Sequence, residues 1–81
     1  MKIKLYSTHT CPYCLMEKAW LEGNKIAHEV VYVDNDQKAA IEMVQRTGQM
    51  GVPVTEVARE GKEPEFVVGF DKGRLAKILG I

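Results

Sequence analysis

The two cysteines of the chain lie three positions apart, in the stretch Thr10-Cys11-Pro12-Tyr13-Cys14. A short apolar segment precedes this stretch, and a run with helical character follows it. A thiol at the start of a helix faces unpaired backbone N–H groups and the positive end of the helix dipole, and both favour the thiolate. The thiolate is the nucleophile in disulfide exchange. We therefore predict that Cys11 is the attacking sulfur and Cys14 the resolving sulfur.

Composition narrows the setting in which this pair works. The 81 residues have an apolar fraction of 46%, and 11 basic residues balance 11 acidic ones. We expect one domain over residues 1–81, with no charge excess to attract nucleic acid or a membrane. No stretch resembles a signal peptide or could span a bilayer, so we expect a cytoplasmic protein. In that compartment a Cys-x-x-Cys pair is typical of catalysis or metal binding.

The first half of the chain predicts a strand, a helix and a second strand around the cysteines. Residues 2–6 alternate polar and apolar side chains, and Pro12 suits a first helical turn. Apolar residues recur at helical spacing through Glu22 and predict this helix: Leu15, Ala19 and Leu21, with Met16 and Trp20 beside them. Gly23 and Asn24 tolerate a left-handed conformation and are expected to end it. Residues 30–33 are typical of a strand buried on both faces, which completes a βαβ unit with parallel strands.

The second half predicts a helix, a hairpin and a final helix. Residues 34–36 carry helix-capping side chains, and four of the positions that follow share one helical face: Ala40, Met43, Val44 and Thr47. Gly48 ends this helix. A hairpin follows: residues 52–54 enter a strand that continues roughly to Val57, and residues 65–68 return. Asp71 caps a last helix with its core face at Leu75, Ile78 and Leu79. The order β-α-β-α-β-β-α predicts an α/β fold, with a four-stranded mixed sheet flanked by three helices.

On these motifs the chain resembles the glutaredoxin family, within the thioredoxin-fold superfamily, over nearly all 81 residues. The segments that carry the resemblance are Cys11-Pro12-Tyr13-Cys14, Thr47-Gly48-Gln49, Val52-Pro53, and Gly69 with Asp71 before the last helix. More narrowly, residues 48–54 and 68–71 resemble short glutaredoxin-like proteins of bacteria and archaea. The Gly69-Phe70 pair is also similar to the glutaredoxin-like electron donors of ribonucleotide reductase.

The resemblance implies a dithiol–disulfide oxidoreductase that reduces protein disulfides or glutathione mixed disulfides through Cys11 and Cys14. Thr10, Pro12, Tyr13 and Pro53 would support the active site, with Pro53 after a cis peptide bond and facing the dithiol. The backbone of Val52 would bind an extended peptide as an added strand. The other residues implied to bind substrate or glutathione are Gly51, Gly69, Phe70 and Asp71.

The resemblance also implies the partners, and several positions depart from the common family pattern. Thr8 stands where many glutaredoxins have a lysine, Met50 and Gly51 where they have a basic residue and a threonine, and Phe70 replaces a glycine. Asp71 keeps the acidic group that can meet the glutathione amine. Either glutathione or a flavoprotein of the thioredoxin reductase type would supply electrons. We expect a monomer with no bound cofactor and no metal, whose redox centre is the Cys11–Cys14 disulfide.

A carrier of a soft metal, copper or zinc, is the alternative for the two cysteines. Structural zinc needs four ligands, and the sequence offers no second cysteine pair. Small copper-carrier domains also place Cys-x-x-Cys at a loop-to-helix start, but they run β-α-β-β-α-β and end on a strand. The predicted final helix favours the redox interpretation. His9 would favour the Cys11 thiolate if protonated, but a solvated loop histidine is the interpretation that we favour.

Overall fold

The computed structural model describes residues 1–81, and its elements follow the predicted order. They are β1 (Lys2–Ser7), α1 (Pro12–Gly23), β2 (Glu29–Tyr32), α2 (Gln37–Thr47), β3 (Val54–Ala58), β4 (Glu65–Val68) and α3 (Lys72–Leu79). The strands form one sheet in the order β2-β1-β3-β4. β1 is parallel to β2 and antiparallel to β3, which is antiparallel to β4. The predicted four-stranded mixed sheet with three helices is therefore confirmed.

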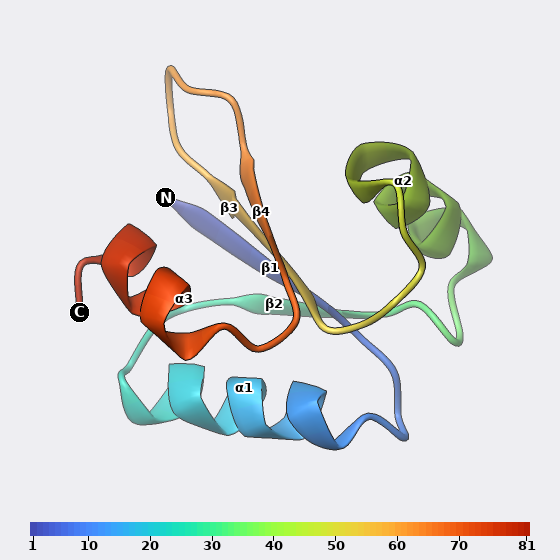
Figure 1. Cartoon of the computed structure of the whole chain (residues 1–81), viewed down its shortest axis with the longest axis horizontal. Coiled ribbons are helices and arrows are strands. Elements are labelled where there is room, and N and C mark those ends of the chain that lie inside the picture. Colours follow the sequence, from blue (N-terminus) through green and yellow to red (C-terminus); the bar gives the residue numbers. More distant parts are fainter.

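Helices cover both faces of the sheet. Figure 1 shows α1 and α3 on one side and α2 on the other. On the first side, Ile3 and Val57 of the sheet pack with two leucines of the helices, Leu21 and Leu79. On the second side, Tyr6, Met43 and Val54 form a separate buried cluster. Neighbouring positions of a strand point to opposite faces, so β1 and β3 contribute to both clusters.

The helix predicted from the apolar spacing forms as α1, but only one of its three spaced apolar positions, Leu21, lies in the core. Leu15 and Met16 are 62% and 53% exposed, and the buried side chains of the helix are Cys14, Glu17 and Leu21. These three positions follow the helical spacing i, i+3, i+7, which defines one face. The helix therefore presents a thiol and a carboxyl to the sheet where the sequence suggested only apolar side chains.

Two local predictions in the first half are confirmed only in part. β2 is an edge strand with one exposed and three half-buried residues, so it is not buried on both faces. The apolar composition of β2 did not distinguish an edge strand from a central strand of the sheet. α1 ends at Gly23 with Asn24 as its C-cap, as predicted, but the left-handed residue that follows is Lys25, with φ 57°.

The ends of the other two helices form as predicted. Asp36 caps α2 by accepting from the Ala39 N–H at 3.0 Å, and Asp71 caps α3 by accepting from the Arg74 N–H at 3.1 Å. Gly48 and Gly80 end the same helices with φ near 74°. Such left-handed ends favour glycine.

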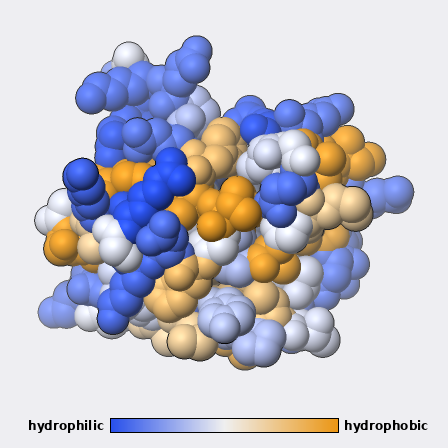
Figure 2. Space-filling view, viewed as in Figure 1, coloured by the Kyte–Doolittle hydropathy of each residue, from blue (hydrophilic) through white to orange (hydrophobic).

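The surface contains one hydrophilic projection. The turn between β3 and β4, residues 59–64, extends away from the sheet, and Figure 2 shows hydrophilic residues at this upper-left corner. The interpretation of this segment as a solvated hairpin turn is confirmed. None of the three helices has the length and apolar character needed to cross a membrane.

Candidate active site

The register of the sheet brings four loops to one end of the molecule. Tyr6 near the end of β1 pairs with Val54 at the start of β3, which in turn pairs with Val68 at the end of β4. Ser7 pairs with Tyr32 at the end of β2. Four loops therefore lie at the same end of the strands: 8–11, 33–36, 51–53 and 69–71. The sequence-predicted site residues from three distant parts of the chain lie in these loops or at the adjoining start of α1.

Cys11 and Cys14 occupy the start of α1 and are joined as a disulfide, with their Cα atoms 5.2 Å apart. Cys11 is the N-cap residue, and its Sγ accepts a hydrogen bond from the Cys14 backbone N–H at 3.1 Å. Pro12 follows at the first helical turn, where its missing N–H leaves no unsatisfied donor. Cys11 is half-buried, whereas Cys14 is 2% exposed. Of the two sulfur-bearing residues, Cys11 is thus the one open to an external molecule.

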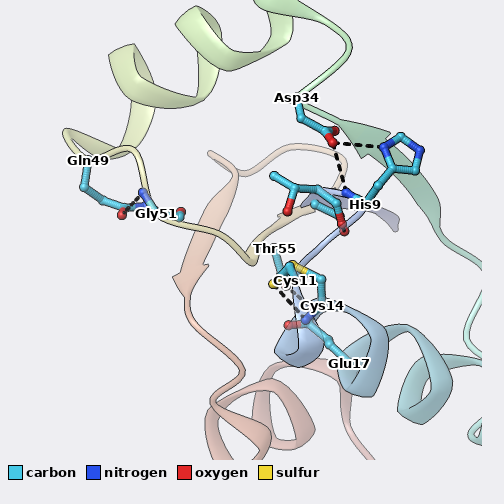
Figure 3. The surroundings of a disulfide bond; sticks show 10 residues. His9, Cys11, Cys14, Glu17, Asp34, Gln49, Gly51 and Thr55 are labelled. Carbon is cyan, nitrogen blue, oxygen red and sulfur yellow. Dashed lines mark hydrogen bonds and ion pairs between the residues drawn. A yellow bond between two sulfur atoms is a disulfide. The ribbon is translucent and has the colours of Figure 1, made fainter.

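A buried hydrogen bond ties this helix to the sheet beside the proline loop. The Thr55 hydroxyl on β3 donates to Oε2 of Glu17 on α1, and both residues are fully buried. Figure 3 shows Glu17 and Thr55 next to the two cysteines. Burial raises the pKa of Glu17 above its ordinary value of 4.5, while the Thr55 hydrogen bond and the charge of His28 act in the opposite direction. Sequence reasoning missed Glu17; the spacing Cys14, Glu17, Leu21 was the available signal.

His9 is an exposed loop histidine, as predicted, with a side chain that is 51% exposed, and it is also anchored by Asp34. Its backbone N–H donates to Oδ2 of Asp34 at 3.1 Å, and its Nδ1 lies 3.0 Å from the same oxygen. The ring stacks on Tyr32 with centroids 4.0 Å apart. The two hydrogen bonds from His9 hold the pKa of the Asp34 carboxyl below its usual value. The loop before Cys11 is thereby fastened to the end of β2.

This anchor yields a testable expectation for the loop. Replacing Asp34 by Ala removes the acceptor for both His9 bonds, so the His9 amide should exchange with solvent at least ~10-fold faster, since it becomes an exposed, unbonded N–H. Hydrogen exchange followed by NMR measures this rate. Asn35→Ala is the matched control, because that neighbouring side chain makes no hydrogen bond in the structure. An unchanged His9 exchange rate in Asp34→Ala would mean that the anchor does not order the loop.

The loop before Pro53 is organised by a side chain. Gln49 Nε2 donates to the Gly51 carbonyl at 3.0 Å, and Gln49 Oε1 accepts from the Gly51 N–H at 2.6 Å (Figure 3). Both polar groups of the Gly51 backbone are therefore engaged within the protein. The Val52 N–H and C=O take part in none of the loop hydrogen bonds, and the Val52–Pro53 peptide bond is cis, as the resemblance implied.

The remaining predicted residues lie on the far side of this loop. The Gly69 N–H donates to the Pro53 carbonyl at 2.8 Å, so the loop and the end of β4 are joined. Gly69 has φ 80°, a conformation that favours glycine. Phe70 packs edge-on against Trp20 of α1, with ring centroids 5.9 Å apart. Asp71 uses Oδ1 to cap α3, which leaves Oδ2 without a partner within the protein.

Exposed apolar side chains flank the dithiol. Tyr13 within the motif is 63% exposed, Met16 after it 53%, and Met50 before Val52 80%. Thr10 is also exposed. The two main surface hollows have volumes of about 410 and 580 Å³. Residues such as Lys2 and His28 line the first and residues such as Gln37 and Arg46 line the second, so the dithiol lies outside both.

Fold and site together define a thioredoxin-fold protein with a redox-capable cysteine pair at the start of its first helix. The family model for glutaredoxin matches residues 3–61. A glutaredoxin-like 8.6 kDa protein encoded in a rubredoxin operon of Clostridium pasteurianum is 36% identical over 77 residues, covering 95% of this chain and 96% of that protein. The chain therefore belongs to the glutaredoxin family.

Two further relatives agree with this assignment. Glutaredoxin 3 of Escherichia coli is 31% identical over 51 residues, which cover 63% of this chain and 61% of that protein. The crystal structure of the glutaredoxin from Methanosarcina mazei superposes with a TM-score of 0.82 at 27% identity, covering 99% of this chain and 79% of the other. Family membership and the Cys11–Cys14 disulfide are consistent with a redox role.

Proposed function

We propose that the protein is a dithiol–disulfide oxidoreductase that reduces protein disulfides and glutathione mixed disulfides through Cys11 and Cys14. The observation that carries this proposal is the asymmetry of the pair. Cys11 caps α1 and its Sγ accepts the Cys14 N–H, whereas Cys14 is buried beneath it. A hydrogen bond to sulfur and the helix dipole both favour the Cys11 thiolate. An external disulfide then meets Cys11 first.

The proposed reaction is thiol–disulfide exchange in two steps. The Cys11 thiolate attacks one sulfur of the substrate disulfide, forms a mixed disulfide and releases the other sulfur as a thiolate. Cys14 then attacks Cys11 Sγ, the bond to the substrate breaks, and the Cys11–Cys14 disulfide remains. Two electrons pass from the two cysteines to the substrate. With a glutathionylated substrate, a second glutathione could replace Cys14 in the second step. The chemistry uses the two sulfur atoms and requires no bound cofactor.

The loops beside the dithiol favour an extended peptide as the bound group. The unpaired N–H and C=O of Val52 offer one pair of hydrogen bonds of the kind that adds a strand. Gly51 was also predicted to bind, but Gln49 engages both of its polar groups. The Gly69 N–H is likewise used by Pro53. We therefore propose that Val52 supplies the backbone contacts, with Asp71 Oδ2 available to an amine.

The exposed apolar rim suits a protein substrate. Tyr13 and Met16 of α1 and Met50 of the loop before Pro53 are exposed apolar side chains, and patches of such side chains mark interaction surfaces. No lysine stands at position 8 to meet a glutathione carboxylate. Both observations favour a protein dithiol or a thioredoxin-reductase-type flavoprotein as electron donor, with glutathione as the second candidate. We place the reaction in the cytoplasm and expect a monomer.

A soft-metal carrier remains the second candidate for the cysteine pair. No group of three or more His, Cys, Asp or Glu side chains gathers around the two cysteines or elsewhere. A metal ion held by Cys11 and Cys14 would therefore need ligands from outside this chain, because zinc in a structural site takes four. Family membership favours the redox function over this alternative.

One assay separates these functions. The oxidised protein is supplied either with glutathione and its reductase or with thioredoxin reductase, and consumption of reduced nicotinamide cofactor is followed with a protein disulfide as substrate. We expect turnover with at least one donor, and the donor that recycles the protein identifies the subclass. In parallel the reduced protein is titrated with Cu(I) and zinc. Tight stoichiometric metal binding without turnover by either donor would contradict the proposal.

A further inference from the structure

The buried face of α1 places a carboxyl beside the resolving cysteine. Cys14 and Glu17 are three residues apart on one helix, and both side chains point toward the sheet, with exposures of 2% and 0%. Side chains at this spacing are neighbours on a helix surface, with Cβ atoms about 5–6 Å apart. Figure 3 shows both at the start of α1. A titratable group thus lies next to the sulfur that water reaches least.

Only one of the two carboxyl oxygens of Glu17 is hydrogen-bonded in the disulfide form. Its Oε2 accepts from the Thr55 hydroxyl, but its Oε1 is buried and has no hydrogen-bond partner. Buried polar atoms are normally paired, because an unpaired one loses its hydrogen bonds to water without replacement. Reduction of the disulfide creates a new donor on this same face, the Cys14 S–H. The unpaired oxygen is explained if its partner is present in the other redox state.

We infer that Glu17 is the internal acid–base group for Cys14. The inference rests on the dithiol exchange proposed above. Because Cys14 is sealed from solvent, its thiol proton needs an acceptor inside the protein when the sulfur attacks. Glu17 is the one carboxyl on the buried face of α1. Its raised pKa brings it closer to neutrality, where an acid–base group is most effective.

The proton and the electrons balance in the second step of exchange. In the mixed disulfide, the Glu17 carboxylate takes the proton from Cys14 Sγ, and Cys14 Sγ attacks Cys11 Sγ. The Cys11–Cys14 bond forms, the bond from Cys11 to the substrate sulfur breaks, and the electron pair leaves on the substrate thiolate. The proton remains on Glu17. When a donor thiolate later attacks Cys11 Sγ, Cys14 leaves and takes the proton back from Glu17.

The side chains packed around Cys14 include no other group suited to exchange this proton with it. The facing side chain of β3 is the Thr55 hydroxyl, and its register partners on β1 and β4, Leu5 and Val67, are buried and apolar. α3 contributes only Leu75 and Leu79 to the interior. His28, before β2, acts on the carboxyl through its charge and has its Nδ1 bonded to the Ile26 carbonyl. No other acid faces Cys14 from these elements.

The test separates the two steps of exchange in one trace. The reduced protein is mixed with an excess of a chromogenic aromatic disulfide, so that attack by Cys11 releases one coloured thiolate and resolution by Cys14 releases the second. Glu17→Gln should leave the first phase unchanged and slow the second by about 100-fold near neutral pH, at the low end of general base catalysis. The second phase should also lose the part of its pH profile that belongs to a carboxyl. Glu22→Gln, an exposed carboxyl on the same helix, is the matched control and should change neither phase.

A second measurement does not depend on turnover. In a Cys11→Ser background Cys14 is the sole thiol, and its thiolate absorbance is followed against pH. With Glu17 present the titration should be broadened by coupling to the carboxyl. With Glu17→Gln it should become a single step at lower pH, since a neighbouring negative charge is gone. Identical titrations with and without Glu17, or an unchanged second phase, would overturn the inference.

Further outcomes keep the inference distinct from the proposed function and from misfolding. Absence of the first phase in the parent protein would contradict the function itself. If Glu17→Gln does not fold, Thr55→Val serves instead, because it keeps the carboxyl and removes the hydrogen bond that lowers the pKa of Glu17. The pH profile of the second phase should then move to higher pH. A profile that stays in place in Thr55→Val would overturn the role of Glu17.

Discussion

Replacing Cys11 by Ser should reduce disulfide exchange to the uncatalysed background with every substrate, while Cys14→Ser should keep turnover with glutathionylated substrates. The expectation follows from the different roles of the two cysteines, in which Cys11 attacks the substrate and Cys14 releases it. Serine caps helices well, so Cys11→Ser preserves the start of α1 and removes only the nucleophilic sulfur. In Cys14→Ser the hydrogen bond to Cys11 Sγ survives, because its donor is the backbone N–H of position 14. The attacking thiolate is thus kept.

The two variants are compared in one assay with a glutathione mixed disulfide and a protein disulfide as alternative substrates. Cys14→Ser should accumulate a covalent mixed disulfide with the protein substrate, seen as a reducible mass increase, because no second thiol releases it. Circular dichroism of both variants controls for folding. If Cys14→Ser is as inactive as Cys11→Ser toward the glutathione mixed disulfide, the single-cysteine route is wrong.

Glu17 should make the stability of the oxidised protein fall as the pH rises above 4.5. Burial raises the pKa of Glu17 in the folded state, so between its ordinary value of 4.5 and the raised value the folded protein holds a proton that the unfolded chain has lost. Unfolding is then favoured by rising pH, with a slope of at most about 1.4 kcal/mol per pH unit from this single group. Above the raised pKa, the stabilising contribution of Glu17 protonation to the free energy of unfolding is fully lost.

Urea unfolding of the oxidised protein from pH 4 to pH 9, each pH held with equal ionic strength, measures this dependence. Glu17→Gln retains an acceptor for Thr55 but does not titrate, so its free energy of unfolding should exceed that of the parent at pH 8 and match it more closely at pH 4. The Glu22→Gln control should follow the parent. Parallel pH curves for the parent and Glu17→Gln would show that the buried carboxyl does not titrate differently on folding.

The sequence predicted the topology because each element carries a local signal. The alternation in β1, the caps at Asp36 and Asp71, and the left-handed glycines at 48 and 80 act over a few residues, and the structure forms them. The cysteine pair was found by its spacing. These features depend on the chain near them and not on distant partners.

The errors and omissions concern features that depend on tertiary contacts. The apolar residues Leu15 and Met16 are exposed, whereas Glu17 is buried. Glu17 can be buried because its carboxylate accepts a hydrogen bond from Thr55, 38 positions later in the chain. The anchor of His9 on Asp34 joins segments 25 positions apart. No periodicity marks either pair. Likewise, the apolar residues of β2 did not reveal that helices leave this edge of the sheet partly uncovered.

The hydrogen bonds between Gln49 and Gly51 restrict which residues the loop before Pro53 can carry. A Cβ added at position 51 would lie 2.9 Å from Gln49 Oε1, so any larger residue there displaces the glutamine and frees the backbone that it holds. Positions 49 and 51 are therefore coupled: a single substitution at 51 would change both the side chain at that position and the number of backbone hydrogen-bonding groups that the loop leaves free.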